Sequence, residues 1–289
     1  MDSNLIRRVA FAVVAIPLAL AVIWYGGFPL AFLVALASAL GTRELFDLAA
    51  KQGLRPPRAF GLVSAAALAP ITYATVMAPD VRALVLPAWP YLMALWLMAL
   101  LAWTLAARSP AEKPLETVGV TLLATAYTAA FPAFLIGIRH TQFAERSWPA
   151  AWLVFFPLVV TWVCDTAAMF GGRTFGGAKL APAVSPGKTR SGAAAGVVGG
   201  LLVAPIFGLA VFPRFGIEVP LWQLLVMAGV LSVVGQVGDL VESLFKRQAG
   251  VKDSGHLIPG HGGVLDRLDS LYLVIPAAAV LYRLFGVIR

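Results

Sequence analysis

Charged side chains are scarce in this chain. Only 12% of its 289 residues are Asp, Glu, Lys or Arg, whereas a soluble domain carries about a quarter. Hydrophobic residues make up 60% of the chain, and its mean hydropathy is +0.85. This balance excludes an ordinary soluble domain and indicates a protein with several membrane-spanning segments.

Cysteine and histidine are almost absent as well. A single cysteine, Cys164, excludes an internal disulfide, and three scattered histidines exclude a Cys/His zinc module. Basic residues outnumber acidic ones, 22 against 14. In a chain this apolar we interpret the basic excess as loops that face the cytoplasm and anionic headgroups, and we predict no nucleic-acid partner.

Apolar runs are what the chain has in abundance. A spanning helix needs about 20 mostly apolar residues. We therefore predict an all-α, polytopic membrane helical bundle of about nine transmembrane helices, forming a single integral membrane domain over 1–289. The predicted spans are approximately Val9–Tyr25, Pro29–Leu48, Ala59–Met77, Ala83–Ala106 (interrupted by Pro87 and Pro90), Thr117–Ile138, Ala151–Phe170, Gly192–Phe212, Leu221–Phe245 and Val264–Phe285.

The distribution of Lys and Arg predicts the orientation of these spans. With nine spans and a cytoplasmic N-terminus, the cytoplasmic segments hold 16 of the 22 basic residues. The opposite side holds Arg82, Arg139, Arg146, Arg214, Arg283 and Arg289. The first apolar run has no obvious cleavage site, so we expect it to remain as a membrane helix. The N-terminal spans lie in 1–140, and the polar motifs lie in 150–289.

The polar residues gather near the last two predicted spans. Asp239, Glu242, Ser243 and Lys246 follow i, i+3, i+4 and i+7 spacing, so they form one polar stripe on an apolar helix. Asp266 and Asp269 are three residues apart and share a helix face. Helix N-termini favour acidic residues in any case, but three aspartates on two neighbouring spans point to a site, because ionisable residues in membranes are usually functional.

Three carboxylates beside cations predict a metal and phosphate site. Oxygen ligands suit Mg²⁺, which proteins hold through one or two carboxylates plus substrate phosphates. We therefore predict Asp239, Asp266 and Asp269 as Mg²⁺ ligands. Gly262 and Gly263, next to His261, would let backbone N–H groups approach a phosphate. The predicted phosphate-neutralising cations are Lys246, Arg247, Lys252 and Arg267.

A second basic loop precedes the seventh predicted span. Its "GKT" is not a Walker A motif, because Pro182 stands where that motif needs a glycine. Ser185, Lys188, Thr189 and Arg190 are candidates to bind phosphate at a helix N-terminus, and an ordinary positive loop is the equal alternative. Asp165, in the sixth span, would line the site or pair with Arg173. Glu44 and Asp47 are interpreted as interfacial, with Arg43 as a local partner.

These motifs resemble those of the phosphatidate cytidylyltransferases, the membrane CDP-diacylglycerol synthases. The family pattern is S-x-x-K-R, then K-D, then H-G-G-x-x-D-R-x-D, and every spacing is kept. Gly238–Asp239, the segment Asp165–Arg173 and "SPGKT" also fit, while Ser191 stands where the family usually has a glutamate. The residues that carry the pattern are Ser243, Lys246, Arg247, Lys252, Asp253, His261, Gly262, Gly263, Asp266, Arg267 and Asp269.

The resemblance implies that the chain joins CTP and phosphatidic acid, giving CDP-diacylglycerol and pyrophosphate. It implies Mg²⁺ and a second cation, with K⁺ as the candidate. Independently of the resemblance, a cysteine-poor chain with no cleaved signal fits a bacterial inner membrane, and the basic loops predict a site on the cytoplasmic face. Glycine-rich helices permit a homodimer without requiring one.

Two alternatives stay open at the level of sequence. One is a related membrane lipid-phosphate enzyme, such as a CDP-archaeol-type synthase or a polyprenol kinase. The other is a secondary transporter, whose polar residues should lie near the bilayer midplane in two related halves. The polar residues here gather at one face instead, which disfavours the transporter.

Overall fold

The computed structural model describes residue 13, residues 17–257 and residues 262–288. In that part of the chain, seven helical segments are long and apolar enough to cross a membrane. The protein is an all-α polytopic membrane protein, as the composition predicts. The count of nine spans and the position of the N-terminus stay predictions, because most of the first predicted span lies outside the described residues; within it, residues 17–25 are helical.

Most helices match the predicted spans to within a few residues. The elements are α2 (Gly27–Ala50), α3 (Arg58–Met77), α4 (Pro79–Ala107), η1 (Pro110–Glu112), α5 (Pro114–Thr125), η2 (Ala126–Ala130), α6 (Phe131–His140), α7 (Trp148–Phe175), β1 (Lys179–Ala181), β2 (Ser185–Thr189), α8 (Arg190–Ile206), η3 (Phe207–Val211), η4 (Phe212–Phe215), α9 (Leu221–Gln248), α10 (Leu265–Leu268) and α11 (Leu271–Leu284).

The predicted interruption of the fourth span is wrong. Pro87 and Pro90 lie inside α4, which is continuous from Pro79 to Ala107. A proline within a helix removes one hydrogen bond and kinks the helix without necessarily ending it. The fifth and seventh spans instead contain one π-helical turn each, η2 and η3, while the helical run continues through them.

The last predicted span is divided in two. The short helix α10 ends at Leu268, and α11 begins at Leu271. Gly238 of α9 lies against this junction, where a Cβ on it would come within 2.8 Å of the carbonyl oxygen of Asp269. The close approach of α9 therefore coincides with the break, and α10 and the turn at Asp269 lie outside the seven long apolar helices.

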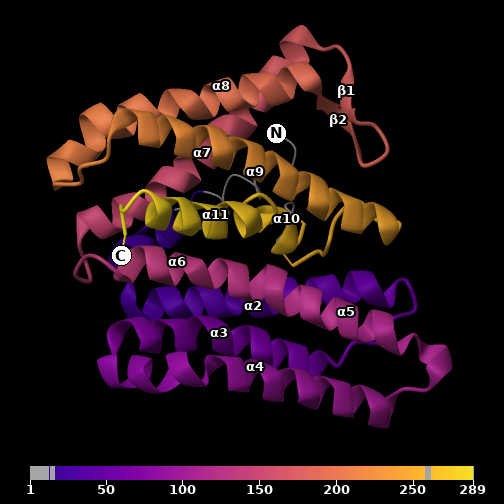
Figure 1. Cartoon of the computed structure of the whole chain (residues 1–289). Coiled ribbons are helices and arrows are strands. Elements are labelled where there is room, and N and C mark those ends of the chain that lie inside the picture. Colours follow the sequence, from indigo (N-terminus) through magenta and orange to yellow (C-terminus); the bar gives the residue numbers. More distant parts are fainter. Residues whose placement is uncertain (1–12, 14–16, 258–261, 289) are drawn as a thin grey trace.

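The helices lie side by side in tiers (Figure 1). One tier contains α7, α8 and α9, and another contains α2, α3, α4, α5 and α6, with α11 between them. Glycines allow the close packing of α7 and α8: a Cβ on Gly192 would come within 2.7 Å of the carbonyl oxygen of Ala168. The glycine-rich start of α8 thus makes the close helix contact that the sequence predicts.

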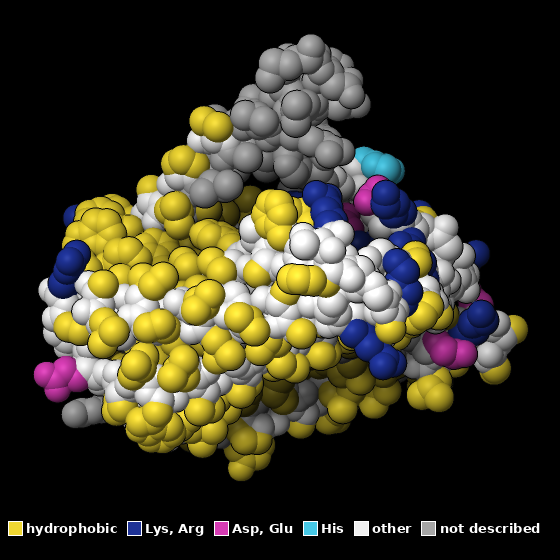
Figure 2. Space-filling view, turned by 90° about the horizontal axis from the view of Figure 1, so that it is seen from above, with side chains coloured by type: hydrophobic (Ala, Val, Ile, Leu, Met, Phe, Trp, Pro, Cys, Tyr) yellow, Lys and Arg dark blue, Asp and Glu magenta, His cyan; other side chains and the backbone are white. Residues whose placement is uncertain are grey.

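The basic loops meet at one end of the bundle. Gln248, at the end of α9, donates a 2.7 Å hydrogen bond to Gln52, and Arg108 donates one to the carbonyl of Arg55. Figure 2 shows Lys and Arg side chains gathered at one end of the molecule, beside an otherwise largely hydrophobic surface. The predicted sharing of one end by these loops is confirmed, whereas the compartment that this end faces stays a prediction.

The second basic loop is a small hairpin, which the sequence analysis missed. Strands β1 and β2 pair antiparallel, with Lys179 opposite Thr189 and Ala181 opposite Ser185. The "SPGKT" segment is therefore a strand, and the turn lies before it, where the N–H of Val184 donates to the carbonyl of Ala181. Strands of three and five residues are too short to give a clear alternating pattern in the sequence.

Candidate active site

A pocket of about 780 Å³ opens at the basic end of the bundle, between α7, β2, α8, α9 and α10. It collects eight of the predicted site residues from four separate elements. These are Asp165, Arg173, Lys188, Thr189, Asp239, Asp266, Arg267 and Asp269. Apolar residues such as Trp162 and Met169 complete its wall, so the carboxylates face a partly apolar enclosure in which charges interact strongly.

Asp239 is the carboxylate most clearly held by a cation. Its Oδ2 lies 2.6 Å from the Nζ of Lys188 on β2, and Ser243, one turn further along α9, donates a 3.3 Å hydrogen bond to its Oδ1. Lys188 and Asp239 are each about 30% exposed or less. The pair therefore joins the hairpin to α9 across the pocket.

Lys246 connects α9 to α10. Its Nζ lies 2.5 Å from Oε2 of Glu242 and 2.7 Å from Oδ1 of Asp266. Glu242 is completely buried, so the predicted polar stripe does face the interior of the bundle. A buried carboxylate without a cation is costly, so Lys246 stabilises Glu242 where it lies. Its predicted contact with phosphate stays a prediction.

Asp266 organises the segment between α9 and α10. Its Oδ2 accepts hydrogen bonds from the N–H of Ser254 (2.9 Å), the hydroxyl of Ser254 (2.9 Å) and the N–H of Gly263 (2.8 Å). Burial opposes its ionisation, but Lys246 and these donors lower the pKa of Asp266 to about 2. The carboxylate is ionised and its oxygens already have partners.

Two predicted roles meet competing contacts. Asp266 was expected to bind a metal, and both of its oxygens have protein donors here; its role as a metal ligand stays a prediction. Gly263 was expected to present its N–H to a phosphate, yet that N–H donates to Asp266. A Cβ on Gly263 would also overlap Glu44 and Ser254, which explains why glycine is needed there.

Glu44 belongs to the buried hydrogen-bond network of the site, which its sequence context does not predict. It was interpreted as interfacial, but it is only 6% exposed and accepts hydrogen bonds from Ser254 Oγ (2.8 Å), Val264 N (2.9 Å) and Leu265 N (2.8 Å). Arg43 was the predicted ionic partner, but Asp47 forms its ion pair with Arg58, at 2.6 Å. The available signal was an acidic residue inside an apolar run, six residues before the end of α2.

Asp269 lines the same pocket as Asp239. Its Oδ1 accepts a 2.6 Å hydrogen bond from the N–H of Ser270. Burial and the negative charge of Asp239 raise the pKa of Asp269 to about 6. Asp165 on α7 also experiences the negative charges of Asp269 and Asp239. Three mutually repelling carboxylates thus face one pocket, where a bound cation would relieve the repulsion.

Several residues in and next to the hairpin make contacts that stabilise the local structure. Thr189 is the N-cap of α8, where its hydroxyl accepts from the N–H of Gly192 at 3.1 Å. Ser191, at the position of the family glutamate, donates to the carbonyl of Gly176. Arg247, expected to bind phosphate, donates to the carbonyls of Val184 and Val251. It holds the hairpin turn against the end of α9.

The remaining predicted residues lie at the edges of the site or outside the described chain. Lys252 and Asp253 are exposed in the segment that follows α9, and Gly262 has a φ of 82°, which favours glycine. Ser185, half-buried, begins β2. His261 lies outside the described residues. Arg173 and Arg267 are exposed and line the pocket together with its carboxylates.

No group of three or more His, Cys, Asp or Glu side chains lies close enough to hold a metal ion in the described part of the chain. Two carboxylates can nevertheless suffice for Mg²⁺ when water and phosphates complete its coordination. Asp239 and Asp269 provide oxygen donors of the right kind, and the ammonium of Lys188 already occupies the cation side of Asp239. The donor set fits Mg²⁺, and its binding stays a prediction.

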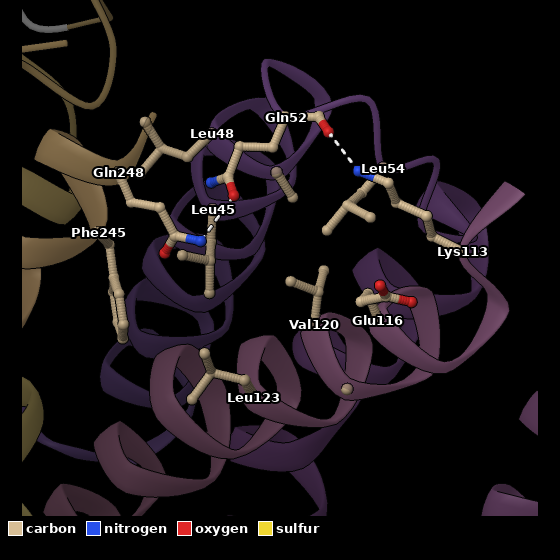
Figure 3. A pocket seen from close by; sticks show the side chains of 12 residues that line it. Leu45, Leu48, Gln52, Leu54, Lys113, Glu116, Val120, Leu123, Phe245 and Gln248 are labelled. Atoms are coloured by element: carbon tan, nitrogen blue, oxygen red, sulfur yellow. Dashed lines mark hydrogen bonds between the residues drawn. The ribbon is translucent and has the colours of Figure 1, made fainter. Parts of the chain in front are cut away.

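A second cavity of about 430 Å³ lies at the same end of the bundle, between α2, α5 and α9 (Figure 3). Leucines line its floor, and Gln52, Lys113, Glu116 and Gln248 surround its mouth. It includes none of the predicted site residues. The carboxylate-lined pocket is therefore the candidate active site.

The fold and the pocket define a polytopic membrane protein with an acidic and basic site at one end of its bundle. Comparison with known sequences gives the family. The model of the "Cytidylyltransferase family" matches residues 6–285, so the chain belongs to that family.

Curated relatives carry a more specific name. The phosphatidate cytidylyltransferase of Brucella suis biovar 1 is 53% identical over 139 residues, 47% of this chain and 47% of that protein. The Staphylococcus saprophyticus enzyme of the same name is 42% identical over 146 residues, 50% of this chain and 55% of its own. That of Bacillus subtilis is 40% identical over 171 residues, 59% and 60% respectively. The chain spans about half the length of the curated relatives it matches.

Proposed function

We propose that this protein transfers the cytidylyl group of CTP to phosphatidic acid, giving CDP-diacylglycerol and pyrophosphate. The observation that carries this proposal is the pocket in which Asp239, Asp269 and Asp165 meet Lys188, Arg173 and Arg267 at the basic end of a membrane bundle. Family membership and the names of the relatives support it.

The reaction depends more on neutralising the charge of the phosphates than on a strong general base. A phosphate oxygen of phosphatidic acid attacks the α-phosphorus of CTP, a new P–O bond forms, and the bond to the departing pyrophosphate breaks. The attacking phosphate is already ionised near neutral pH. Catalysis can therefore rest on positioning and on neutralising the phosphates.

Each side chain has a distinct part in this proposal. Asp239 and Asp269 would hold Mg²⁺, which when bound offsets phosphate charge and aligns the reacting groups. Arg173 and Arg267, which line the pocket, would bind phosphate oxygens. Lys188 would exchange its partner Asp239 for a phosphate when a cation occupies that carboxylate.

Other residues would keep this arrangement in place. Lys246, Asp266 and Glu44 form a buried polar connection between α9, α10 and α2. They would fix the position of Asp269 in the turn between α10 and α11. We infer that these three act on turnover through geometry.

The direct test is a radiolabelled-CTP assay on the purified protein with phosphatidic acid, with EDTA and with Mg²⁺ restored. We expect CDP-diacylglycerol only when CTP, phosphatidic acid and Mg²⁺ are all present. The related lipid-phosphate enzymes are separated by exchanging ATP for CTP and an isoprenoid glycerol-ether phosphate or polyprenol for phosphatidic acid. Product that requires ATP would contradict the proposal.

We also propose the bacterial inner membrane as the location, with the pocket on the cytoplasmic side, because the basic loops lie at that end. K⁺ as a second cation and a homodimer stay predictions. Potassium titration of turnover checks the first, and light scattering of the detergent-solubilised protein checks the second.

A further inference from the structure

A third cavity, which is wholly apolar, adjoins the candidate active site. It has a volume of about 570 Å³, and only apolar atoms are exposed along its lining. One residue, Trp162 of α7, borders both this cavity and the carboxylate-lined pocket. The apolar cavity, which we call the aromatic groove, is lined by Leu20, Ala21, Trp24, Trp148, Trp152, Phe155, Val159 and Trp162.

One face of α7 supplies both cavities. Trp148, Trp152, Phe155, Val159 and Trp162 recur at steps of four and three residues, which places them on a single helix face. The same steps continue to residues 165, 169 and 172, which line the carboxylate pocket. Along this face the side chains are mostly aromatic up to Trp162, and Asp165 follows one turn later.

The groove has the dimensions of an extended hydrocarbon chain. Between Trp148 and Trp162 the helix rises about 21 Å, at roughly 1.5 Å per residue. Residues 17–25 form its other wall, through Leu20, Ala21 and Trp24. Large aromatic rings pack along it, with the rings of Trp24 and Trp148 centred 5.7 Å apart and those of Trp148 and Trp152 6.2 Å apart. Such rigid walls can bind an apolar chain at a low cost in entropy.

The position of the groove relative to the carboxylate pocket follows from α7. Trp162 lies near the middle of α7 (Trp148–Phe175). The α7 residues that line the carboxylate pocket lie on its C-terminal half, and those that line the groove lie on its N-terminal half. Figure 1 shows α7 with the hairpin β1–β2 at its C-terminal end. An acyl chain attached to a phosphate in the carboxylate pocket would meet the groove at Trp162, which borders both cavities.

We infer that the aromatic groove binds one acyl chain of the phosphate-bearing lipid whose headgroup enters the carboxylate pocket. This inference rests on the proposed function for the identity of that headgroup. Trp162 then marks the boundary between headgroup and chain, and the length of the groove determines which chain lengths are turned over efficiently.

The test uses substitutions that narrow the groove from each of its two walls, α7 and residues 17–25. Val159→Phe and Ala21→Phe each add a ring to the lining, and Ala21 is exposed, so its replacement should not disturb the core. The matched control is Val198→Phe on α8, whose side chain is 57% exposed and lines none of the three cavities. The full-length protein is assayed in mixed micelles with dihexanoyl and dipalmitoyl phosphatidate.

We expect the ratio of kcat/KM for the dipalmitoyl over the dihexanoyl substrate to fall about tenfold in both groove variants, the effect of losing burial of roughly two methylene groups. The control should keep the wild-type ratio. An unchanged ratio in both groove variants would overturn the inference and leave the proposed function intact. A wild-type protein that forms no CDP-lipid from either substrate would overturn the proposed function instead.

A binding measurement tests occupancy without turnover. Brominated phosphatidate, at a low mole fraction in phosphatidylcholine nanodiscs, should quench tryptophan fluorescence more than brominated phosphatidylcholine at the same fraction. Both groove variants should lose this excess quenching, and Val198→Phe should retain it. Equal quenching by the two lipids in the wild-type protein would mean that the groove holds only bulk lipid, and the inference would be wrong.

Discussion

The carboxylate of Glu44 accepts a 2.8 Å hydrogen bond from the backbone N–H of Leu265, a residue 221 positions further along the chain. It also accepts from the N–H of Val264 and from the hydroxyl of Ser254. An acidic side chain of α2 thus accepts hydrogen bonds from N–H groups at the start of α10 that have no partner within that helix. It takes the place of a local N-cap. The N-terminal half of the protein is in this way part of the site.

Glu44→Gln should reduce both stability and activity. The amide keeps one acceptor oxygen but presents an NH₂ group to backbone N–H donors, and an unsatisfied buried donor costs about 1–3 kcal/mol. A small displacement of α10 should lower turnover by roughly a hundredfold. The measurements are thermal unfolding in detergent and the CTP assay.

Asp47→Asn is the matched control for that change. Asp47 is on the same helix and forms a partly exposed pair with Arg58, and such pairs contribute about 0–1 kcal/mol. It should behave as wild type. Equal losses in the two variants would show that the hydrogen bonds of Glu44 have no special importance.

Asp239→Asn should lower turnover by roughly a hundredfold or more, because it removes a proposed Mg²⁺ ligand and the ionic partner of Lys188. The protein should still insert and purify, since the amide can accept from Ser243. The same substitution at exposed Asp80, at the opposite end of the bundle, should have no effect. Near-normal Mg²⁺-dependent turnover of Asp239→Asn would refute the metal assignment.

Lys246→Met should destabilise the protein strongly, by about 3–5 kcal/mol, because Glu242 and Asp266 lose their shared cation. The double variant Lys246→Met/Glu242→Gln removes one of the two uncompensated charges and should recover part of that loss. Chemical denaturation in detergent measures both. A double variant that is less stable than the single one would contradict this account.

Gly263→Ala should lower the midpoint of thermal unfolding, since the added Cβ would overlap Glu44 and Ser254. Overpacking of this kind costs about 1–3 kcal/mol. Gly119→Ala on α5 is the control: a Cβ there meets no atom within 4 Å, and alanine favours the helix. A larger loss in the control would exclude the steric explanation.

The orientation can be tested by labelling single cysteines in a Cys164→Ser background. Ser109→Cys lies between α4 and α5 at the basic end, and Gln142→Cys lies between α6 and α7 at the opposite end; both positions are exposed. In intact cells a membrane-impermeant maleimide should label Gln142→Cys and leave Ser109→Cys unlabelled. The reverse pattern would place the pocket on the outer face.

The sequence by itself determined the class of fold and the ends of most helices. Apolar runs of membrane length can form only helices in lipid, because the backbone must satisfy its own hydrogen bonds there. It also identified the motif residues: i, i+3 and i+4 spacing places Asp239, Glu242 and Ser243 on one face of α9, and Asp239, Asp269 and Lys188 all line one pocket.

Only the tertiary structure decided which acidic residues hold a loop in place and which face the pocket. Glu44 and Asp266 both look like acidic residues near helix ends, and nothing local distinguishes a carboxylate that holds a loop from one that faces substrate. That distinction depends on which donors arrive from distant segments, as Ser254 and Leu265 do at Glu44. Long-range packing brings these donors together, and hydrogen-bond partners so far apart leave no periodic pattern in the sequence.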